Sequence, residues 1–235
     1  MSERYLFINY SFMKIKDIRR ILYNEFIAGQ TPADWILIVC GLLLQVVTYI
    51  VTGDSVLSLI TGMLGVFSVT LCSQRKVSSF FFGLFQILCY MVLSARQHFY
   101  GELIENSFYL ITTLVGAYTW SCNYNASDEG NSVEARKLTV KGWLVTLFLF
   151  VVGSAGGYWI LCQTSDPHPM LDSVSTVPAL VAQVLMLLRY REQWLFWIVV
   201  DSIKVVMWIM QGDWCMAAQF SFWLIICFYG LKKWK

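Results

Sequence analysis

The chain has 235 residues, of which 57% are hydrophobic and only 14% charged, and its mean hydropathy is +0.60. This balance excludes an ordinary soluble domain and indicates an all-α protein that crosses a membrane several times. The net charge of +2 gives no reason to expect a nucleic-acid partner.

Residues 1–33 precede the first apolar stretch and include the basic residues Lys14, Lys16, Arg19 and Arg20. The segment has neither the uninterrupted apolar core nor the small-residue cleavage site of a secretory signal peptide. We therefore expect an amphipathic segment that lies on the cytoplasmic membrane surface.

Eight apolar stretches follow, and we interpret each as a membrane-spanning helix. They cover residues 34–53, 55–74, 77–95, 100–121, 143–162, 173–188, 192–211 and 213–231. With eight spans, every basic residue except Arg96 and Lys204 falls on one side of the membrane. Lysine and arginine accumulate on the cytoplasmic side, so both termini are predicted to be cytoplasmic.

The second half of the chain repeats part of the first. Residues 107–120 match residues 221–234 at a constant offset of 114, with identical Ser, Phe, Leu, Ile, Gly and Trp. The same ungapped offset pairs Arg75 with Arg189 in two loops. One linking span makes the two three-helix repeats parallel, related by an axis along the membrane normal. The predicted order is an extra N-terminal helix (34–53), a first repeat (55–121), a linker loop and linking helix (122–172) and a second repeat (173–235).

The span at 192–211 has one face that includes charged side chains, which are costly to place inside a membrane. Trp194, Trp197, Asp201, Lys204 and Trp208 follow at three- and four-residue steps, which places them together on a helix. A charged group at membrane depth costs at least ~2.5–3.5 kcal/mol, so this face is expected to point inward. It predicts a cavity with aromatic walls and a carboxylate, suited to a flat ring, including a cationic one. In the alternative, Asp201 and Lys204 neutralise each other and only fasten helices.

Other spans offer polar and aromatic side chains to the same cavity. The further candidates for substrate binding are Phe82, Gln86, Tyr90, Asn106, Tyr109, Trp120, Gln183 and Trp223. In the alternative, Gln86, Gln183 and Gln219 only hydrogen-bond neighbouring helices, because an amide in hydrocarbon needs a partner. Glu102 and Glu105 lie in the first turns of their helix, and we expect mainly structural roles for them.

No catalytic or metal-binding pattern stands out. The sequence contains no phosphate-binding loop, no D-x-D pair and no Ser/His/Asp or Cys/His set, so an enzyme is not expected. The seven cysteines form no C-x-x-C pair and are interpreted as packing residues. We expect neither a cofactor nor a metal site.

The run from Val181 to Asp201, with its W-x-x-W-x-x-x-D core, resembles the C-terminal half of the PnuC nicotinamide riboside transporters. The Tyr100-Gly101-Glu102 triplet resembles the matching part of the N-terminal half, and the resemblance covers residues 55–235. It implies a fold related to the SWEET sugar carriers and a trimer in the bacterial cytoplasmic (inner) membrane. It also implies facilitated diffusion of nicotinamide riboside, trapped by a cytoplasmic kinase for NAD biosynthesis.

Carried over by this resemblance, Trp194, Trp197 and Asp201 contribute to the vitamin site, and Gln86 and Tyr90 face them from the first half. Lys204 departs from the pattern, since an uncharged residue is expected there. Two other functions stay open: transport of thiamine or another vitamin on the same fold, and a non-transporting membrane scaffold in which the polar face only joins helices.

Overall fold

The computed structural model of the chain describes residues 23, 25–122, 124–125 and 132–234. In this part the chain forms one two-stranded hairpin, β1 (Tyr124–Asn125) and β2 (Ser132–Val133), and eight long helices. The helices are α2 (Pro32–Thr52), α3 (Val56–Ser73), α4 (Ser79–Arg96), α5 (Tyr100–Cys122), α6 (Val140–Leu161), α7 (Pro169–Leu187), α8 (Gln193–Gln211) and α9 (Trp214–Lys233).

Seven of these eight described helices are long and apolar enough to cross a membrane. The eighth, α5, has 23 residues and is more polar, since it carries Glu102, Glu105 and Asn106. The predicted all-α membrane architecture with eight helices is confirmed, and the largest difference in a helix boundary is at α7, expected from 173 and observed from Pro169. Most of the amphipathic segment expected at 1–33 lies outside the described residues.

Local signals in the sequence set several helix ends. Side-chain oxygens of Thr31, Ser55, Thr139 and Asp213 accept hydrogen bonds from backbone N–H groups in the first turns of α2, α3, α6 and α9. These N-caps satisfy donors that have no partner inside the helix. At the other end of α8, Gly212 has φ +73°, a left-handed conformation that glycine adopts without steric cost.

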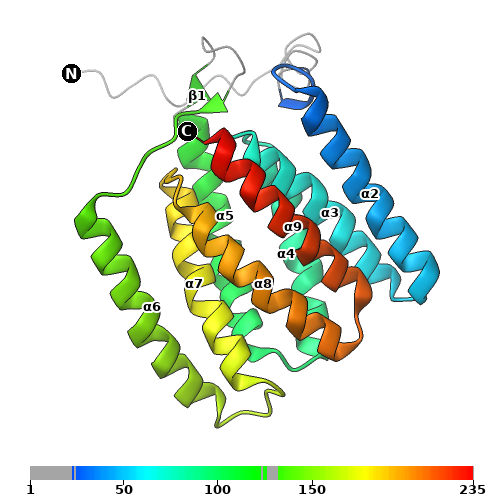
Figure 1. Ribbon diagram of the computed structural model, residues 1–235, viewed down its shortest axis with the longest axis vertical. Coiled ribbons are helices and arrows are strands. Elements are labelled where there is room, and N and C mark those ends of the chain that lie inside the picture. The colour runs from blue at the N-terminus through cyan, green and yellow to red at the C-terminus, as the bar shows by residue number, and fades with distance from the viewer. Residues whose placement is uncertain (1–22, 24, 123, 126–131, 235) are drawn as a thin grey trace, which may run out of the picture.

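Six helices form a closed ring. Each packs on the next in the order α3, α4, α5, α7, α8, α9, and α9 returns to α3. Outside the ring, α2 packs on α3 and α9, while α6 packs mainly on α7 and stands at the edge of the bundle in Figure 1. The loops after α3 and α7 meet at one end with Arg75, Lys76, Arg189 and Arg191. We call this the basic end and the other the opposite end.

The internal repeat is visible in the backbone. Arg75 and Arg189, which are 114 positions apart, both adopt left-handed conformations, with φ of 61° and 65°. His98 and Gly212 are related by the same offset and also have positive φ, 58° and 73°. The loops that follow the first and second helices of each repeat therefore turn in the same way, although only one of the four positions is a glycine.

The last helix of each repeat packs on the other repeat in an equivalent way. The indole N–H of Trp120 on α5 donates to the carbonyl of Met186 at 3.3 Å, at the end of α7. The indole N–H of Trp234, 114 positions later, donates to the carbonyl of Ser73 at 3.1 Å, at the end of α3. Two like contacts therefore join the repeats at the basic end.

Two equivalent glycines allow a large ring to pack closely. Gly116 on α5 lies against Phe80, and Gly230 on α9 lies against Trp194. The two glycines are 114 positions apart, and so are the two aromatic residues. A Cβ on Gly230 would lie 2.5 Å from Trp194 Cε2, which is too close for non-bonded carbon atoms. The absent side chains thus make room for the aromatic residues at the start of α4 and α8.

Gly230→Ala is therefore expected to lower the free energy of unfolding by about 1–3 kcal/mol, because Trp194 has to move within a packed core. Thermal unfolding of the detergent-purified protein measures the effect. Gly156→Ala on α6 is the matched control, since no atom lies within 4 Å of its added Cβ. Equal midpoints for the two variants would contradict the close packing of Gly230.

The linker between the repeats contacts both of them at the basic end. Val133 N–H donates to the carbonyl of Arg75 at 3.4 Å, in the α3–α4 loop. Arg136 N–H donates to the carbonyl of Arg189 at 2.7 Å, and Arg191 N–H donates back to Arg136 at 2.8 Å. The linker thus joins two equivalent loops of the two repeats before it enters α6.

Candidate functional site

A cavity of about 110 Å³ lies inside the ring, and all six ring helices contribute to its wall. Eighteen of its 22 lining residues form nine pairs at the offset of 114, so the cavity surrounds the axis that relates the repeats. The pairs are Val69 and Gln183, Cys72 and Met186, Phe80 and Trp194, Gly83 and Trp197, Ile87 and Asp201, Tyr90 and Lys204, Asn106 and Phe220, Tyr109 and Trp223, and Thr113 and Cys227.

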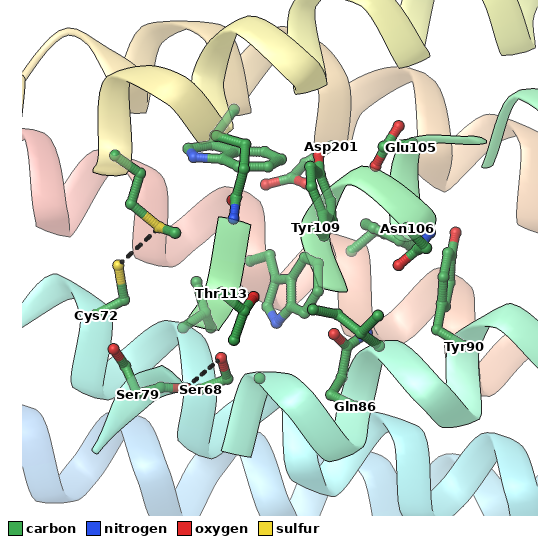
Figure 2. A pocket seen from close by; sticks show the side chains of 18 of the residues that line it. Ser68, Cys72, Ser79, Gln86, Tyr90, Glu105, Asn106, Tyr109, Thr113 and Asp201 are labelled. Atoms are coloured by element: carbon green, nitrogen blue, oxygen red, sulfur yellow. Dashed lines mark hydrogen bonds between the residues drawn. The ribbon is translucent and has the colours of Figure 1, made fainter. Parts of the chain in front are cut away.

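Buried aromatic side chains lie between the cavity and the basic end. Cys72 Sγ and Met186 Sδ, which occupy equivalent positions, meet at 3.5 Å beside the axis, as the dashed line from Cys72 shows in Figure 2. Next to them Trp194 packs on Trp234 with ring centroids 5.8 Å apart, and Trp234 packs on Trp120 at the same distance. These rings close this end of the ring of helices.

A second buried cluster lies between the cavity and the opposite end. Tyr90 packs edge-on against Trp208 and Phe220, with centroids 5.6 and 5.8 Å apart. Phe99 packs against Trp208 at 5.3 Å, and Met216 belongs to the same cluster. The cavity therefore lies between two packed aromatic layers.

The middle of the cavity has aromatic walls from both repeats. Trp197 on α8 is partly buried and meets Tyr109 of α5 edge to face, with centroids 6.0 Å apart. Trp223 on α9 packs on Phe220 at 5.0 Å, and its N–H donates to the carbonyl of Gly65 at 3.2 Å. Several fixed ring faces thus border the space where a flat ligand can lie.

A buried ion cluster borders the cavity towards the opposite end. Lys204 Nζ donates to Glu102 Oε2 at 3.0 Å and to Glu105 Oε1 at 2.5 Å, and none of the three side chains is more than 3% exposed. Tyr90 donates its hydroxyl to Glu102 Oε2 at 2.8 Å, and the indole N–H of Trp208 donates to the Tyr90 hydroxyl at 2.9 Å. The cluster joins α4 and α5 of the first repeat to α8 of the second.

This cluster corrects one interpretation made from sequence and adds detail to another. The alternative in which Lys204 pairs with Asp201 is wrong, because the carboxylates that Lys204 contacts come from α5. Glu102 lies in the first turn of α5 as expected, and both carboxylates are buried, with Glu105 also lining the cavity. Lys204 lies about one hundred residues from these partners along the chain. Helix periodicity relates only residues of one helix, so it could not predict the pairing.

Asp201 remains without a cationic partner among the described residues. Its Oδ2 accepts a hydrogen bond from Cys227 Sγ at 3.3 Å, while Oδ1 has no hydrogen-bond partner within the described chain. Figure 2 shows Asp201 and Gln86 on opposite sides of the cavity. Trp194 Nε1 is likewise buried without a partner in this part of the chain. Buried polar atoms of this kind call for a partner, and a bound ligand can supply one.

The three glutamines singled out from sequence differ in their surroundings. Gln183 Nε2 donates to Thr112 Oγ1 at 3.0 Å, which joins α7 to α5 as the helix-fastening alternative expects. Gln86 lines the cavity from α4. Gln219 does not line it, and a Cβ on Gly65 would lie 3.0 Å from its amide nitrogen. Gln86 is therefore the amide with the clearest access to a ligand.

Nine of the eleven predicted site residues line the cavity: Gln86, Tyr90, Asn106, Tyr109, Gln183, Trp194, Trp197, Asp201 and Trp223. Phe82 and Trp120 do not. Phe82 stacks on Phe67 of α3 instead, with ring centroids 5.0 Å apart. Residues four apart do not stay on one face of a helix with 3.6 residues per turn, so Phe82 falls beside the face that Gln86 and Tyr90 present to the cavity. Trp120 packs against the lining residue Phe80, with ring centroids 5.0 Å apart.

Sequence reasoning missed some lining residues that the repeat itself pointed to. Subtracting 114 from Trp194 selects Phe80, and adding 114 to Asn106 selects Phe220, and both line the cavity. Glu105 had no such signal, since its equivalent is Gln219, which lies outside the lining.

Comparisons with known proteins agree with this geometry. The family model described as nicotinamide mononucleotide transporter matches residues 55–235. A nicotinamide riboside transporter PnuC of Haemophilus influenzae is 33% identical, over 91% of this chain and 94% of that protein. A protein of the same name from Neisseria mucosa is 32% identical, over 90% of this chain and 84% of that protein.

A solved structure shows the same fold. The crystal structure of a vitamin B3 transporter PnuC superposes with a TM-score of 0.81 and 29% identity, covering 92% of this chain and 95% of that chain. The match of the family model over most of the chain and the identity to full-length relatives lead to one assignment. The chain belongs to the PnuC family of nicotinamide riboside transporters.

Proposed function

We propose that this protein carries nicotinamide riboside across the bacterial cytoplasmic membrane by facilitated diffusion. The observation that carries the proposal is the cavity on the axis between the repeats. The Trp197 side chain and Asp201 line it, and one Asp201 oxygen has no hydrogen-bond partner among the residues that the structure describes. Nicotinamide riboside has a flat pyridinium ring, and a cation of this kind is attracted to the face of tryptophan. Relatives that match most of this chain in sequence are named for this substrate.

Each part of the substrate has a candidate partner in the cavity. The pyridinium ring stacks on Trp197 or Trp194, and the carboxamide bonds to Gln86 or Gln183. The ribose hydroxyls bond to Asp201 or Asn106. Tyr90, Tyr109 and Trp223 complete the wall. Trp120 packs behind the lining residue Phe80, whereas Phe82 packs on Phe67 outside the wall.

The charges of the cavity favour the riboside over the mononucleotide in the description of the family model. The charged residues of the lining are Glu105, Asp201 and Lys204, and Lys204 already contacts two carboxylates. A phosphate group therefore meets two carboxylates and an ammonium group that is already paired. The riboside carries no phosphate, and its ring is a cation.

The parallel repeats supply a route for the movement. In carriers built from repeats, one repeat moves against the other around a site between them. Here the aromatic layers at the two ends of the cavity are the parts that separate in turn. Both termini face the cytoplasm in this proposal, and the functional units are the N-terminal segment and helix up to residue 53, the repeats at 55–121 and 173–235, and the linker at 122–172.

Uptake of labelled nicotinamide riboside into liposomes that contain the purified protein tests the proposal. We expect saturable, protein-dependent uptake that stops when inside and outside concentrations are equal, and that continues when a proton or sodium gradient is dissipated. Accumulation that requires such a gradient would contradict facilitated diffusion. Uptake of thiamine alone would leave a vitamin carrier with another substrate, and the absence of any uptake or binding would favour a scaffold.

The proposal also includes a trimeric assembly and a cytoplasmic kinase. We expect a trimer, and light scattering tests this by giving the mass of the protein in its detergent complex. A cytoplasmic kinase that phosphorylates the riboside makes net uptake one-way, since the charged product no longer fits the carrier. Liposomes loaded with such a kinase and ATP should accumulate label beyond the equilibrium level.

A further inference from the structure

We propose that Glu102 and Glu105 set the selectivity of this carrier against phosphorylated substrates, by occupying the ammonium group of Lys204. The inference rests on the proposed function and deepens it. It assigns to two carboxylates of α5 the task of keeping a nucleotide out of a cavity that takes the nucleoside.

The first step is the geometry around the ammonium group. Lys204 Nζ has three donor positions, of which two are used by Glu102 Oε2 at 3.0 Å and Glu105 Oε1 at 2.5 Å. The rings of Phe220 and Tyr90 lie on further sides, with centroids 5.6 and 5.9 Å from Nζ. The ammonium group is thus enclosed by two carboxylates and two aromatic rings, although the side chain borders the cavity.

The second step is that this cluster has no charged counterpart at the equivalent positions of the other repeat. The equivalents of Glu102 and Glu105 in the second repeat are Met216 and Gln219, and the equivalent of Lys204 is Tyr90. The equivalent contact would join Tyr90 of α4 to Met216 and Gln219 of α9, and none of these three side chains is charged. The charged group is therefore an addition to one side of the cavity, beside the shared aromatic walls.

The third step is electrostatic. Burying a phosphate away from water is costly unless cationic donors replace the water, and lysine is a common donor of this kind. Lys204 is the cation of the described lining, and its two carboxylate partners cancel its field in the cavity. Asp201, on the same helix, adds a further negative charge. The pyridinium cation of a nucleoside is favoured in this field, whereas a phosphate is repelled.

Removing one carboxylate should therefore admit the phosphate. In Glu105→Gln the side chain keeps its size and loses its charge, so Lys204 keeps Glu102 as a carboxylate partner and can turn the donor released from Glu105 to a phosphate oxygen. Binding of nicotinamide mononucleotide and of nicotinamide riboside is measured by isothermal titration calorimetry with the purified full-length protein. We expect the affinity for the mononucleotide to rise at least tenfold over that of the unchanged protein, while the affinity for the riboside falls or stays.

Three further variants make the result specific. In Glu105→Gln with Lys204→Met the gain should be lost, because no ammonium group remains for the phosphate. Glu102→Gln should give a gain in the same direction, and it replaces Glu105→Gln if that variant does not fold. Glu134→Gln removes an exposed carboxylate from the linker and should leave both affinities unchanged.

The outcomes separate this inference from the proposed function. If the unchanged protein binds the mononucleotide within tenfold of the riboside, or if neither folded single variant gains affinity for it, the inference is overturned. Loss of stability and riboside binding without a gain for the mononucleotide would assign the cluster a purely structural role, which also overturns it. Failure of the unchanged protein to bind the riboside speaks against the proposed function, and the mononucleotide measurements on the variants still stand.

Discussion

Lys204→Met is expected to lower the free energy of unfolding by about 3–5 kcal/mol, because it leaves the buried carboxylates of Glu102 and Glu105 without their cation. Methionine has a similar volume, so packing against Phe220 and Tyr90 is largely kept. The two carboxylates then repel each other in a site from which water is excluded. Thermal and chemical unfolding of the purified protein in detergent, followed by fluorescence, measures the loss.

Two comparisons decide whether this loss comes from the unpaired charges. The triple variant with Lys204→Met, Glu102→Gln and Glu105→Gln should recover much of the stability, since an uncharged cluster of the same shape is often nearly neutral. Lys141→Met, an exposed lysine at the start of α6, should have little effect. A triple variant less stable than Lys204→Met alone would show that hydrogen bonding, rather than charge, holds the cluster together.

Trp197→Ala is expected to weaken binding of nicotinamide riboside by about thirtyfold, which corresponds to about 2 kcal/mol for a cation on a desolvated indole face. Trp197 is the better candidate for stacking than Trp194, because Trp194 is only 1% exposed and packs between Gly230 and Trp234. Quenching of tryptophan fluorescence by the riboside, checked by calorimetry, gives the dissociation constants.

The matched control is Trp159→Ala, which removes an indole that is 70% exposed on α6. It should leave riboside affinity unchanged. Trp194→Ala should instead lower the midpoint of thermal unfolding, because it leaves a cavity in the packed layer at the basic end. An unchanged riboside affinity in Trp197→Ala would remove this residue from the proposed site.

The fold was accessible from sequence because each of its main features leaves a periodic or compositional trace. Apolar stretches bounded by polar loops predicted the helices to within a few residues, even at α7, which starts with Pro169. The offset of 114 predicted the repeats, and the same offset now relates loop conformations at Arg75 and Arg189. The closed ring of six helices left no such trace, because it depends on contacts between helices far apart in the chain.

The site was accessible only in part. A helix face is set by local spacing, so Trp194, Trp197 and Asp201 were found together on α8. The partners of Lys204 were missed because they lie about one hundred residues away along the chain, beyond the reach of any local pattern. Phe82 was wrongly predicted to line the cavity. A pattern that covers only two helical turns does not distinguish neighbouring positions around the helix axis.

The nine equivalent pairs of lining residues have a consequence for the history of the chain. A carrier assembled from two copies of an ancestral half would place identical residues at equivalent positions, and two copies of the present second repeat would bring two Lys204 side chains opposite Met216 and Gln219. Neither ammonium group would then meet Glu102 or Glu105. Because the two repeats carry charges of opposite sign, each depends on the other, and two copies of either repeat would not rebuild the ion cluster.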